Sequence, residues 1–558
     1  MPSNNITLER MKLSKLLRAV DERRFAIPKL QREFVWDGPK AARLLDSIVR
    51  GMPVGTIMVW QAPRTERLHL RQNYHILPPF DPKHLTVWFL MDGQQRLSVL
   101  HHVREGDVRP NARRRDIDFK RVVLSLEGEN AGQVVHYRKP VEETFVSLSD
   151  VLSSRWRTLL RSLPKRKFAR VAEVRQAVLD YSMFLMFQRA SIEDVREAFL
   201  RINTQGMKIS NADAIFARAE DLHLRDVLHE VRDGLDEAFR DIGEQPVLFA
   251  MLSVRGDSEA RGDALERALT RLEQQVTANP SLRKSLERTW RQLRECFGKA
   301  VDYLRQNYKI LNLEYLYSDY MIAILALFFY RNGGRNADAY QREQINRWFW
   351  STTVSSRYSG RNFNRYIRKD VEYFTKLAEG GRVPFRFAPE ADRRDVTRAQ
   401  YQSRTGITSA CYSLLLLRRP VSIMDDGLNE IPLERYATRA NRKDRHHIFP
   451  AGLMSRFEQP PKDYNSIANI ALLTAQENQR IGRKQPRSYL DSVRDNEKTF
   501  RAKMNRHLIP CGSDSAVWDE DLAGGFRRFL RQRTGLICKE LEELAGMPLF
   551  RGDEPPGR

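Results

Sequence analysis

The feature that most constrains this chain is a pair of adjacent histidines, followed at short range by two asparagines. His446 and His447 lie within the basic stretch Arg442–Gly452, and Asn469 and Asn478 follow. Ile467–Leu473 has the apolar run expected of a buried strand. Thr474-Ala-Gln-Glu477 is a capping box that starts a helix and puts Asn478 in its first turn. The pattern predicts a strand ending before Pro450, a loop, a second strand and a helix.

The two adjacent histidines are suited to different tasks in a catalytic site. Successive side chains of a strand point to opposite faces, so only one of the pair can be a general base. A neutral imidazole accepts a proton near pH 7, and we expect His447 to do so. His446 is then a metal ligand or a structural residue. The amide oxygen of Asn478 suits a hard cation such as Mg²⁺, and Asn469 is expected to tie down the loop.

The charge of the chain favours a polyanionic partner. The formal net charge is +23 and the pI is near 9.9, and cations that neutralise phosphates release counterions and strengthen binding. The alternative is a solvated basic surface with no partner. Four cysteines stand far apart, which argues against a zinc ribbon or a disulfide framework. No signal peptide is visible and the longest apolar run, Tyr320–Tyr330, is too short to span a bilayer, so we expect a cytoplasmic protein that does not contact membranes.

The chain is expected to be a multidomain α+β protein. Residues 7–20 have helical periodicity, and Thr86–Met91 and Tyr181–Phe187 have strand composition. From about residue 211 to 400 the pattern is mainly helical. The predicted organisation is therefore a first domain over 1–220, a helical linking domain over 221–400, a third domain over 401–548 and a disordered tail over 549–558.

A second polar motif, Asp92-Gly-Gln-Gln-Arg96, is expected at a strand-to-helix turn. Gly93 permits a tight backbone, the helix N-terminus offers unpaired N–H groups, and Arg96 is a bidentate cation. This combination suits a phosphate. The alternative is a capped turn with a surface arginine.

The C-terminal motif resembles the His-Me finger (HNH) nucleases, whose ββα-metal arrangement it shares. It is most similar to the nuclease domain of the GmrSD, SspE and BrxU group of modification-dependent (Type IV) restriction enzymes. The resemblance implies that His447 is the general base, that His446 and Asn478 are metal ligands for Mg²⁺ or Mn²⁺, and that Asn469 is structural. Asp444 is an acidic neighbour that could assist as a further ligand.

Three N-terminal segments resemble the first domain of the same group, which is ParB-like and hydrolyses nucleoside triphosphates in its studied members. They are Ile27–Trp36, Met52–Ile57 and Phe199–Gly206. The resemblance implies binding of GTP or ATP, with Asn203 and Gly206 nearby. No Walker A motif is present, so a P-loop NTPase is excluded. The residues implied to bind nucleotide are Asp92, Gly93, Gln94, Gln95, Arg96, Gln31 and Arg32.

Basic and aromatic clusters are candidates for nucleic-acid contact, with a solvated helix face or core packing as the alternative. The aromatic residues are Tyr358, Phe363 and Tyr366. The basic runs are Arg155, Arg157, Arg161, Lys165, Arg166, Lys167 and Arg170; Arg393, Arg394, Arg398 and Arg404; and Arg527, Arg528, Arg531 and Arg533.

The leading hypothesis is an NTP-regulated, metal-dependent DNA endonuclease or nickase of antiphage defence. The resemblance implies that it senses phosphorothioate or hypermodified cytosine in phage or foreign DNA. It also allows a homodimer, or partner proteins from a modification system. The competing hypotheses are a ParB-like, nucleotide-switched DNA-binding protein with an inactive HNH domain, and an RNA-directed nuclease. Intact His446, His447, Asn469 and Asn478 argue against an inactive domain.

Overall fold

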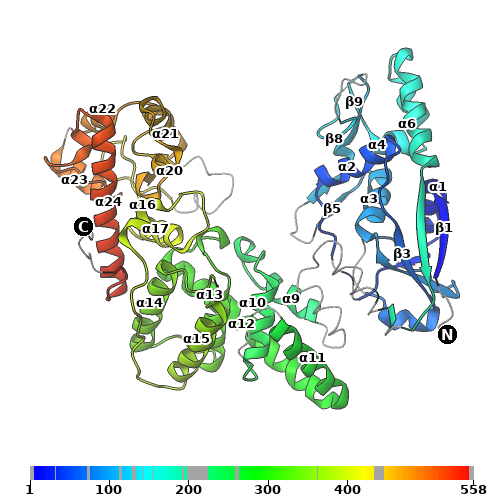
Figure 1. Cartoon of the computed structure of the whole chain (residues 1–558), viewed down its shortest axis with the longest axis horizontal. Coiled ribbons are helices and arrows are strands. Elements are labelled where there is room, and N and C mark those ends of the chain that lie inside the picture. The colour runs from blue at the N-terminus through cyan, green and yellow to red at the C-terminus, as the bar shows by residue number, and fades with distance from the viewer. Residues whose placement is uncertain are drawn as a thin grey trace, which may run out of the picture. The chain divides into compact units, whose positions relative to one another are not determined.

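The chain folds into two compact units, residues 1–221 and 222–558 (Figure 1). A computed structural model describes residues 6–29, 31, 33–71, 76–111, 116–127, 133–141, 144–154, 156–191, 194–195, 198, 224–257, 260, 263–360, 362–432, 445–494 and 496–551. The first unit holds several sheets with helices, and the second is mainly helical. The expectation of a mixed protein of α and β structure is therefore confirmed.

A five-stranded sheet organises the first unit. Its strands, in spatial order, are β1 (Ile6–Lys12), β10 (Ser182–Gln188), β3 (Ile57–Pro63), β4 (Thr86–Asp92) and β2 (Phe25–Ala26). The β1–β10 and β3–β4 pairs are antiparallel, and the β10–β3 and β4–β2 pairs are parallel. The prediction of one helix over 7–20 is wrong in its first half. Residues 6–12 pair along their length with a strand distant in sequence, and such pairing overrides local helical periodicity.

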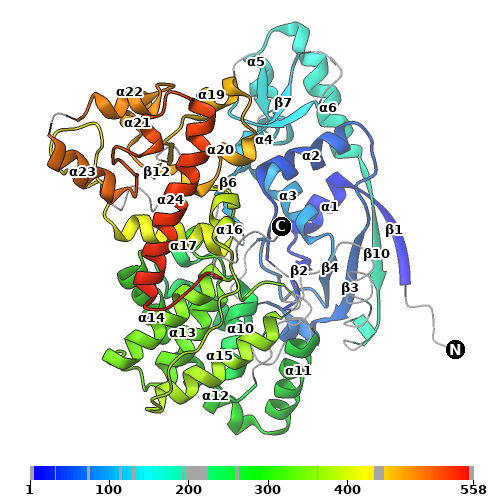
Figure 2. The same cartoon turned by 60° about the vertical axis from the view of Figure 1, so that its left-hand side comes forward.

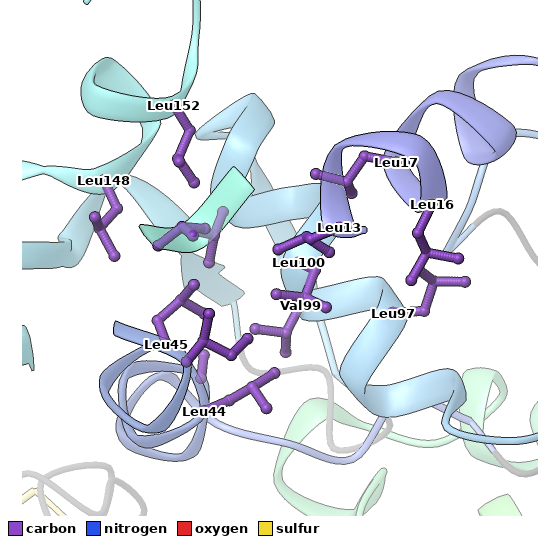
Figure 3. Packing of buried hydrophobic residues seen from close by; sticks show 14 of the residues in the cluster. Leu13, Leu16, Leu17, Leu44, Leu45, Leu97, Val99, Leu100, Leu148 and Leu152 are labelled. Atoms are coloured by element: carbon purple, nitrogen blue, oxygen red, sulfur yellow. The ribbon is translucent and has the colours of Figure 1, made fainter. Parts of the chain in front are cut away.

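Helices bury their apolar faces in one core of this unit. Leucines of α1 (Leu13–Asp21), α2 (Gly38–Val49), α3 (Gln94–Glu105) and α4 (Leu148–Leu152) converge there (Figure 3). Asp37 caps α2 by accepting a hydrogen bond from the Lys40 amide. The other elements of the unit are β5 (Val108–Pro110), β6 (Asp116–Asp118), β7 (Val122–Ser125), β8 (Val135–Tyr137), β9 (Phe145–Ser147), α5 (Trp156–Arg161), α6 (Phe168–Asp180), η1 (Arg64–His69), η2 (Phe119–Arg121) and η3 (Lys165–Lys167).

The second unit begins with a layer of packed helices. Helix α13 (Tyr320–Arg331) is buried along most of its length, as its apolar run predicts. Among the described residues, no helix combines the length and apolarity needed to cross a bilayer. The other elements of this layer are α9 (Leu224–Asp233), η5 (Glu237–Phe239), α10 (Glu244–Ser253), α11 (Asp263–Ala278), α12 (Pro280–Tyr308), η6 (Leu313–Tyr315), α14 (Ala339–Val354), α15 (Phe363–Ala378), α16 (Arg393–Arg398) and α17 (Gly406–Leu417).

The C-terminal part of this unit surrounds a short two-stranded sheet, β11 (Arg445–His447) and β12 (Ile470–Leu472). The long helix α24 (Leu522–Ala545) packs against α14, α16 and α17 (Figure 2). Helices on both sides of residue 400 thus share one compact unit. The remaining elements are α19 (Ala451–Met454), η8 (Ser455–Phe457), α20 (Pro461–Tyr464), η9 (Ile467–Asn469), α21 (Ala475–Ile481), α22 (Pro486–Asp491), α23 (Glu497–Arg506) and η10 (Ala516–Trp518).

Candidate functional site

The histidine pair lies on a strand that pairs with the strand leading to the asparagine helix. In the antiparallel β11–β12 sheet, His446 is opposite Ala471 and His447 is opposite Ile470. Helix α21 follows β12, and its capping box is complete between Thr474 and Glu477. The predicted order of strand, loop, strand and helix is therefore present, although Ile467–Asn469 forms a 3₁₀ turn before the shorter second strand.

His446 is buried and faces the first turns of α21. Its Nδ1 lies 2.6 Å from Oδ1 of Asn478. Burial lowers the pKa of His446 to about 4, against the opposing effect of this hydrogen bond. The ring is therefore neutral near pH 7. Its Nε2 is buried and has no hydrogen-bond partner among the residues that the structure describes.

His447 points away from His446 and meets a different asparagine. Its Nε2 lies 3.0 Å from Oδ1 of Asn465, and the rings of Tyr401 and Tyr464 approach it edge-on. Burial lowers the pKa of His447, while the contact with Asn465 raises it. Sequence reasoning did not find Asn465. Its local pattern is only that of a helix end, and the loop has to fold before it reaches the histidine.

Asn469 closes the loop between the two strands. Its Oδ1 accepts a hydrogen bond from the Phe449 amide, and its Nδ2 donates to the carbonyl oxygens of Phe449 and Tyr464. The Ile448 amide donates to the main-chain oxygen of Asn469. These contacts hold both ends of the loop, and all of them are to main-chain groups.

Arg533 supports the same region from inside the core and corrects a sequence prediction. Its side chain is 0% exposed, so it is not part of a DNA-binding face of α24. The guanidinium donates to the main-chain oxygens of Ala468, His507 and Leu508. The sequence pattern of α24 placed it in a basic run, but the helix is buried on the face that carries it. Burial, with no carboxylate partner among the residues that the structure describes, lowers its pKa to about 9.

The aromatic and second basic clusters also have structural contacts. Tyr358 and Phe363 are buried in the core, so base stacking by these two residues is excluded. In the second run, each arginine has an acidic partner: Arg393 with Glu542, Arg394 with Asp392, Arg398 with Asp395 and Arg404 with Asp319. The first run presents exposed cations at Arg157, Arg161, Lys165 and Arg166, and Arg155 lies outside the described residues.

Exposed cations flank the histidine site itself. The set with no ion pair to a described residue comprises Arg456, Lys462, Arg483 and Lys484. Arg483 packs over Gly452, where an added Cβ would lie 3.0 Å from its Nε. These groups are free to contact a polyanion, whereas Arg480 pairs with Asp425.

His446 and Asn478 supply only part of the set of ligands that a divalent cation needs. Nδ1 of His446 and Oδ1 of Asn478 lie 2.6 Å apart, and for Nδ1 to bind a cation the ring hydrogen would have to be on Nε2 instead. Mg²⁺ commonly keeps several waters and phosphate oxygens beside one or two protein ligands. No group of three or more His, Cys, Asp or Glu side chains in the described parts of the chain is placed to hold a metal. Asp444 lies outside those parts.

The Asp92–Arg96 motif does lie at the predicted strand-to-helix turn, between β4 and α3. Gly93 has φ +90°, and an added Cβ would lie 2.9 Å from the Ile57 side chain, so glycine is required there. Arg96 donates to the main-chain oxygens of Val54 and Thr56 and pairs with Asp92 at 2.7 Å. Its guanidinium therefore already holds the neighbouring loop.

The glutamines near this turn also bind main-chain groups. Gln95 accepts from the amides of Val35 and Trp36 and donates to the oxygen of Glu33. Gln31 donates to the oxygen of Met91. The structure thus brings Gln31 to the Asp92–Arg96 corner. Arg32, Asn203 and Gly206 lie outside the described residues.

Comparison with known proteins links the first unit to restriction enzymes. Residues 13–219 match the family model for the N-terminal domain of the GmrSD restriction endonuclease. A protein of Methanocaldococcus jannaschii, described as uncharacterized, is 20% identical in an alignment covering 95% of this chain and 98% of the relative. The family match supports a GmrSD-like restriction enzyme, a class of endonuclease that acts on DNA.

Proposed function

We propose that this chain is a metal-dependent DNA endonuclease of antiphage defence, with its cleavage centre at His446, His447 and Asn478. The observation that carries the proposal is the divergence of the two histidines on one strand. His446 meets Asn478 and His447 meets Asn465, each through one ring nitrogen. Nδ1 of His447 is the ring nitrogen left for proton transfer, and His446 lies beside the amide oxygen of Asn478. Similarity of the first unit to a restriction endonuclease domain supports DNA as the substrate.

In this proposal His447 accepts the proton of the attacking water. A new P–O bond forms from the water oxygen to phosphorus, and the P–O bond to the leaving sugar oxygen breaks. Burial keeps His447 neutral and able to accept the proton at neutral pH. Asn469 takes no part in proton transfer and keeps the loop in place.

His446 and Asn478 are the residues that would hold Mg²⁺ or Mn²⁺. When bound, such a cation stabilises the negative charge that develops on the phosphate and the leaving oxygen. Asp444 is a further candidate ligand. The neutral imidazole of His446 and the carbonyl oxygen of Asn478 are both electron-pair donors, which supports this role.

The free cations beside the site would hold the DNA backbone. Arg456, Lys462, Arg483 and Lys484 are exposed, and contacts of this kind bind phosphates without selecting a sequence. Discrimination would come instead from a modified base or linkage, such as hypermodified cytosine or phosphorothioate. This part of the proposal rests on the resemblance of the chain to modification-dependent restriction enzymes.

Nucleotide regulation is proposed for the Asp92–Arg96 corner, with a different division of roles from that expected. The N-terminus of α3 and the bend at Gly93 suit a phosphate. Arg96 and Gln95 are engaged by neighbouring loops, so they would shape the site rather than supply free charge. Calorimetric titration of the protein with GTP and with ATP tests binding. If neither nucleotide gives a heat of binding, nucleotide regulation at this corner is contradicted.

The proposed activity is tested by nicking of supercoiled plasmid. Purified protein should convert it to open circle with Mg²⁺ or Mn²⁺ and leave it intact in EDTA. Plasmids with unmodified, glucosylated hydroxymethylcytosine and phosphorothioate DNA test the sensing step, each with and without GTP. An RNA of equal length tests the alternative substrate. Equal cleavage of every DNA would contradict sensing, and cleavage of RNA alone would contradict the DNA endonuclease.

A further inference from the structure

Asn465 is fixed in the loop between β11 and β12 by contacts on both sides of its peptide. Its amide donates to the Pro461 oxygen, and its own main-chain oxygen accepts from the Tyr401 amide at 3.0 Å. Gln400 and Ser466 pair in an isolated bridge beside it. The segment around residue 400 therefore holds this asparagine from outside the loop, and only its side chain is directed to the histidine.

The contact between Asn465 and His447 selects one form of the imidazole. Oδ1 of Asn465 is an acceptor only, so the ring nitrogen 3.0 Å away must carry the hydrogen. That nitrogen is Nε2. A neutral ring has one hydrogen, and the lone pair is then on Nδ1. Within the described parts of the chain, Asn465 is the hydrogen-bond partner of this ring.

The two tyrosines limit how the ring can turn. Tyr401 lies with its centroid 5.2 Å from that of His447 at an interplanar angle of 84°, and Tyr464 lies at 6.4 Å and 69°. Rotation of the ring would break the contact with Asn465 and disturb its T-shaped packing against both tyrosines. A hydrogen bond and two aromatic edges thus define the orientation of Nδ1.

We propose that Asn465 is a positioning residue that holds His447 in the Nε2–H form and so makes Nδ1 the proton acceptor. This inference rests on the proposed function for its catalytic consequence. The neighbouring pair has the opposite pattern, because Asn478 Oδ1 meets Nδ1 of His446. With no cation bound, the two asparagines therefore favour opposite tautomers in the adjacent histidines. Loss of a group that sets the tautomer and orientation of a catalytic histidine costs large factors in rate.

The test compares Asn465→Ala with Asn465→Asp, which keeps an acceptor oxygen. Nitrogen NMR of the full-length protein labelled at histidine reports the tautomer, and His447→Ala assigns the signal. We expect the Nε2–H form in the wild type and in Asn465→Asp, and a mixture of tautomers in Asn465→Ala. In nicking assays, Asn465→Ala should lower kcat about 10- to 100-fold with little change in KM, and Asn465→Asp should recover part of the loss.

A control and two contrary outcomes complete the test. Gln459→Ala lies in the same loop, and its side chain contacts the Phe457 oxygen rather than His447, so tautomer and kcat should not change. An Nδ1–H form in the wild type, or a tautomer unchanged by Asn465→Ala, would overturn the inference. If the tautomer responds as expected but no variant or wild type cleaves DNA, the positioning contact stands and the proposed function fails.

Discussion

The two polar motifs of this chain differ in what their side chains leave available. In the Asp92–Arg96 corner, Gln95 and Arg96 donate to or accept from main-chain groups of two neighbouring loops. At the histidine site, Asn469 also binds main-chain groups, whereas His446 and His447 each contact an asparagine side chain through one ring nitrogen. The Gln95 and Arg96 side chains therefore stabilise the turn at Gly93, whereas His447 keeps one ring nitrogen for proton transfer. Polar residues at a turn therefore indicate a reactive site only where their side chains are not already bound to main-chain groups.

The largest effect that this comparison predicts is loss of cleavage in His447→Ala. Removal of a general base should lower the nicking rate by about 10²- to 10⁴-fold, while the affinity for DNA stays within a small factor. A gel-based nicking time course and a DNA-binding titration measure the two quantities. His229→Ala in α9 of the same unit is the matched control and should cleave as the wild type does. Undiminished cleavage by a clean preparation of His447→Ala would contradict the assignment.

Arg533→Met should give the largest loss of stability. It leaves the buried oxygens of Ala468, His507 and Leu508 without their donor. At about 1–3 kcal/mol for an unsatisfied buried group, we expect the free energy of unfolding to fall by about 3–5 kcal/mol. Denaturant unfolding measures it. Arg531→Met, an exposed change on the same helix, should shift stability by less than about 0.5 kcal/mol. Equal losses of stability from the two changes would contradict the structural role of Arg533.

Arg96→Ala distinguishes a structural role of Arg96 from a role in binding phosphate. The side chain is 18% exposed and donates to Val54 and Thr56, so its loss should lower the stability of the first unit by about 2 kcal/mol. The partner Asp92 is 47% exposed, and that ion pair adds little. Thermal unfolding measures the change. Unchanged stability together with lost nucleotide binding would show that the arginine serves a ligand instead.

A smaller effect is expected from the free cations near the histidines. Arg483→Gln with Lys484→Gln removes two exposed charges, which should weaken DNA binding several-fold and reduce the slope of log K against log salt by about 1–2. Binding titrations over a range of salt concentrations measure the slope. Arg501→Gln is the control, because Arg501 is paired with Glu497 on α23. A change in sequence preference rather than in salt slope would contradict backbone contact.

Local patterns predicted the centre of the second motif well. The capping box of Thr474 and Glu477 and the place of Asn478 depend on residues close in sequence, so the sequence alone could indicate them. The strand at Ile6–Lys12 could not be found this way, because it exists through pairing with Ser182–Gln188. Its own periodicity favoured a helix.

Long-range contacts set the remaining limits of sequence reasoning. Arg533 lies in a basic run in sequence but inside the core in space. Asn465 reaches His447 across a folded loop, and its spacing from the histidine has no motif of its own. Arg96 has the chemistry of a phosphate ligand, yet the nearby carbonyl oxygens bind it first. In each case the partner, rather than the residue type, decides the role.

The central claim is that His446 and Asn478 hold the cation beside a cleaving His447. The most direct measurement is the rate of plasmid nicking as a function of Mn²⁺ concentration for the wild type and Asn478→Ala. We predict saturable, metal-dependent nicking by the wild type, and a need for about 10- to 100-fold more metal in the variant. Nicking by the wild type in EDTA, or the same metal dependence in both proteins, would contradict the claim.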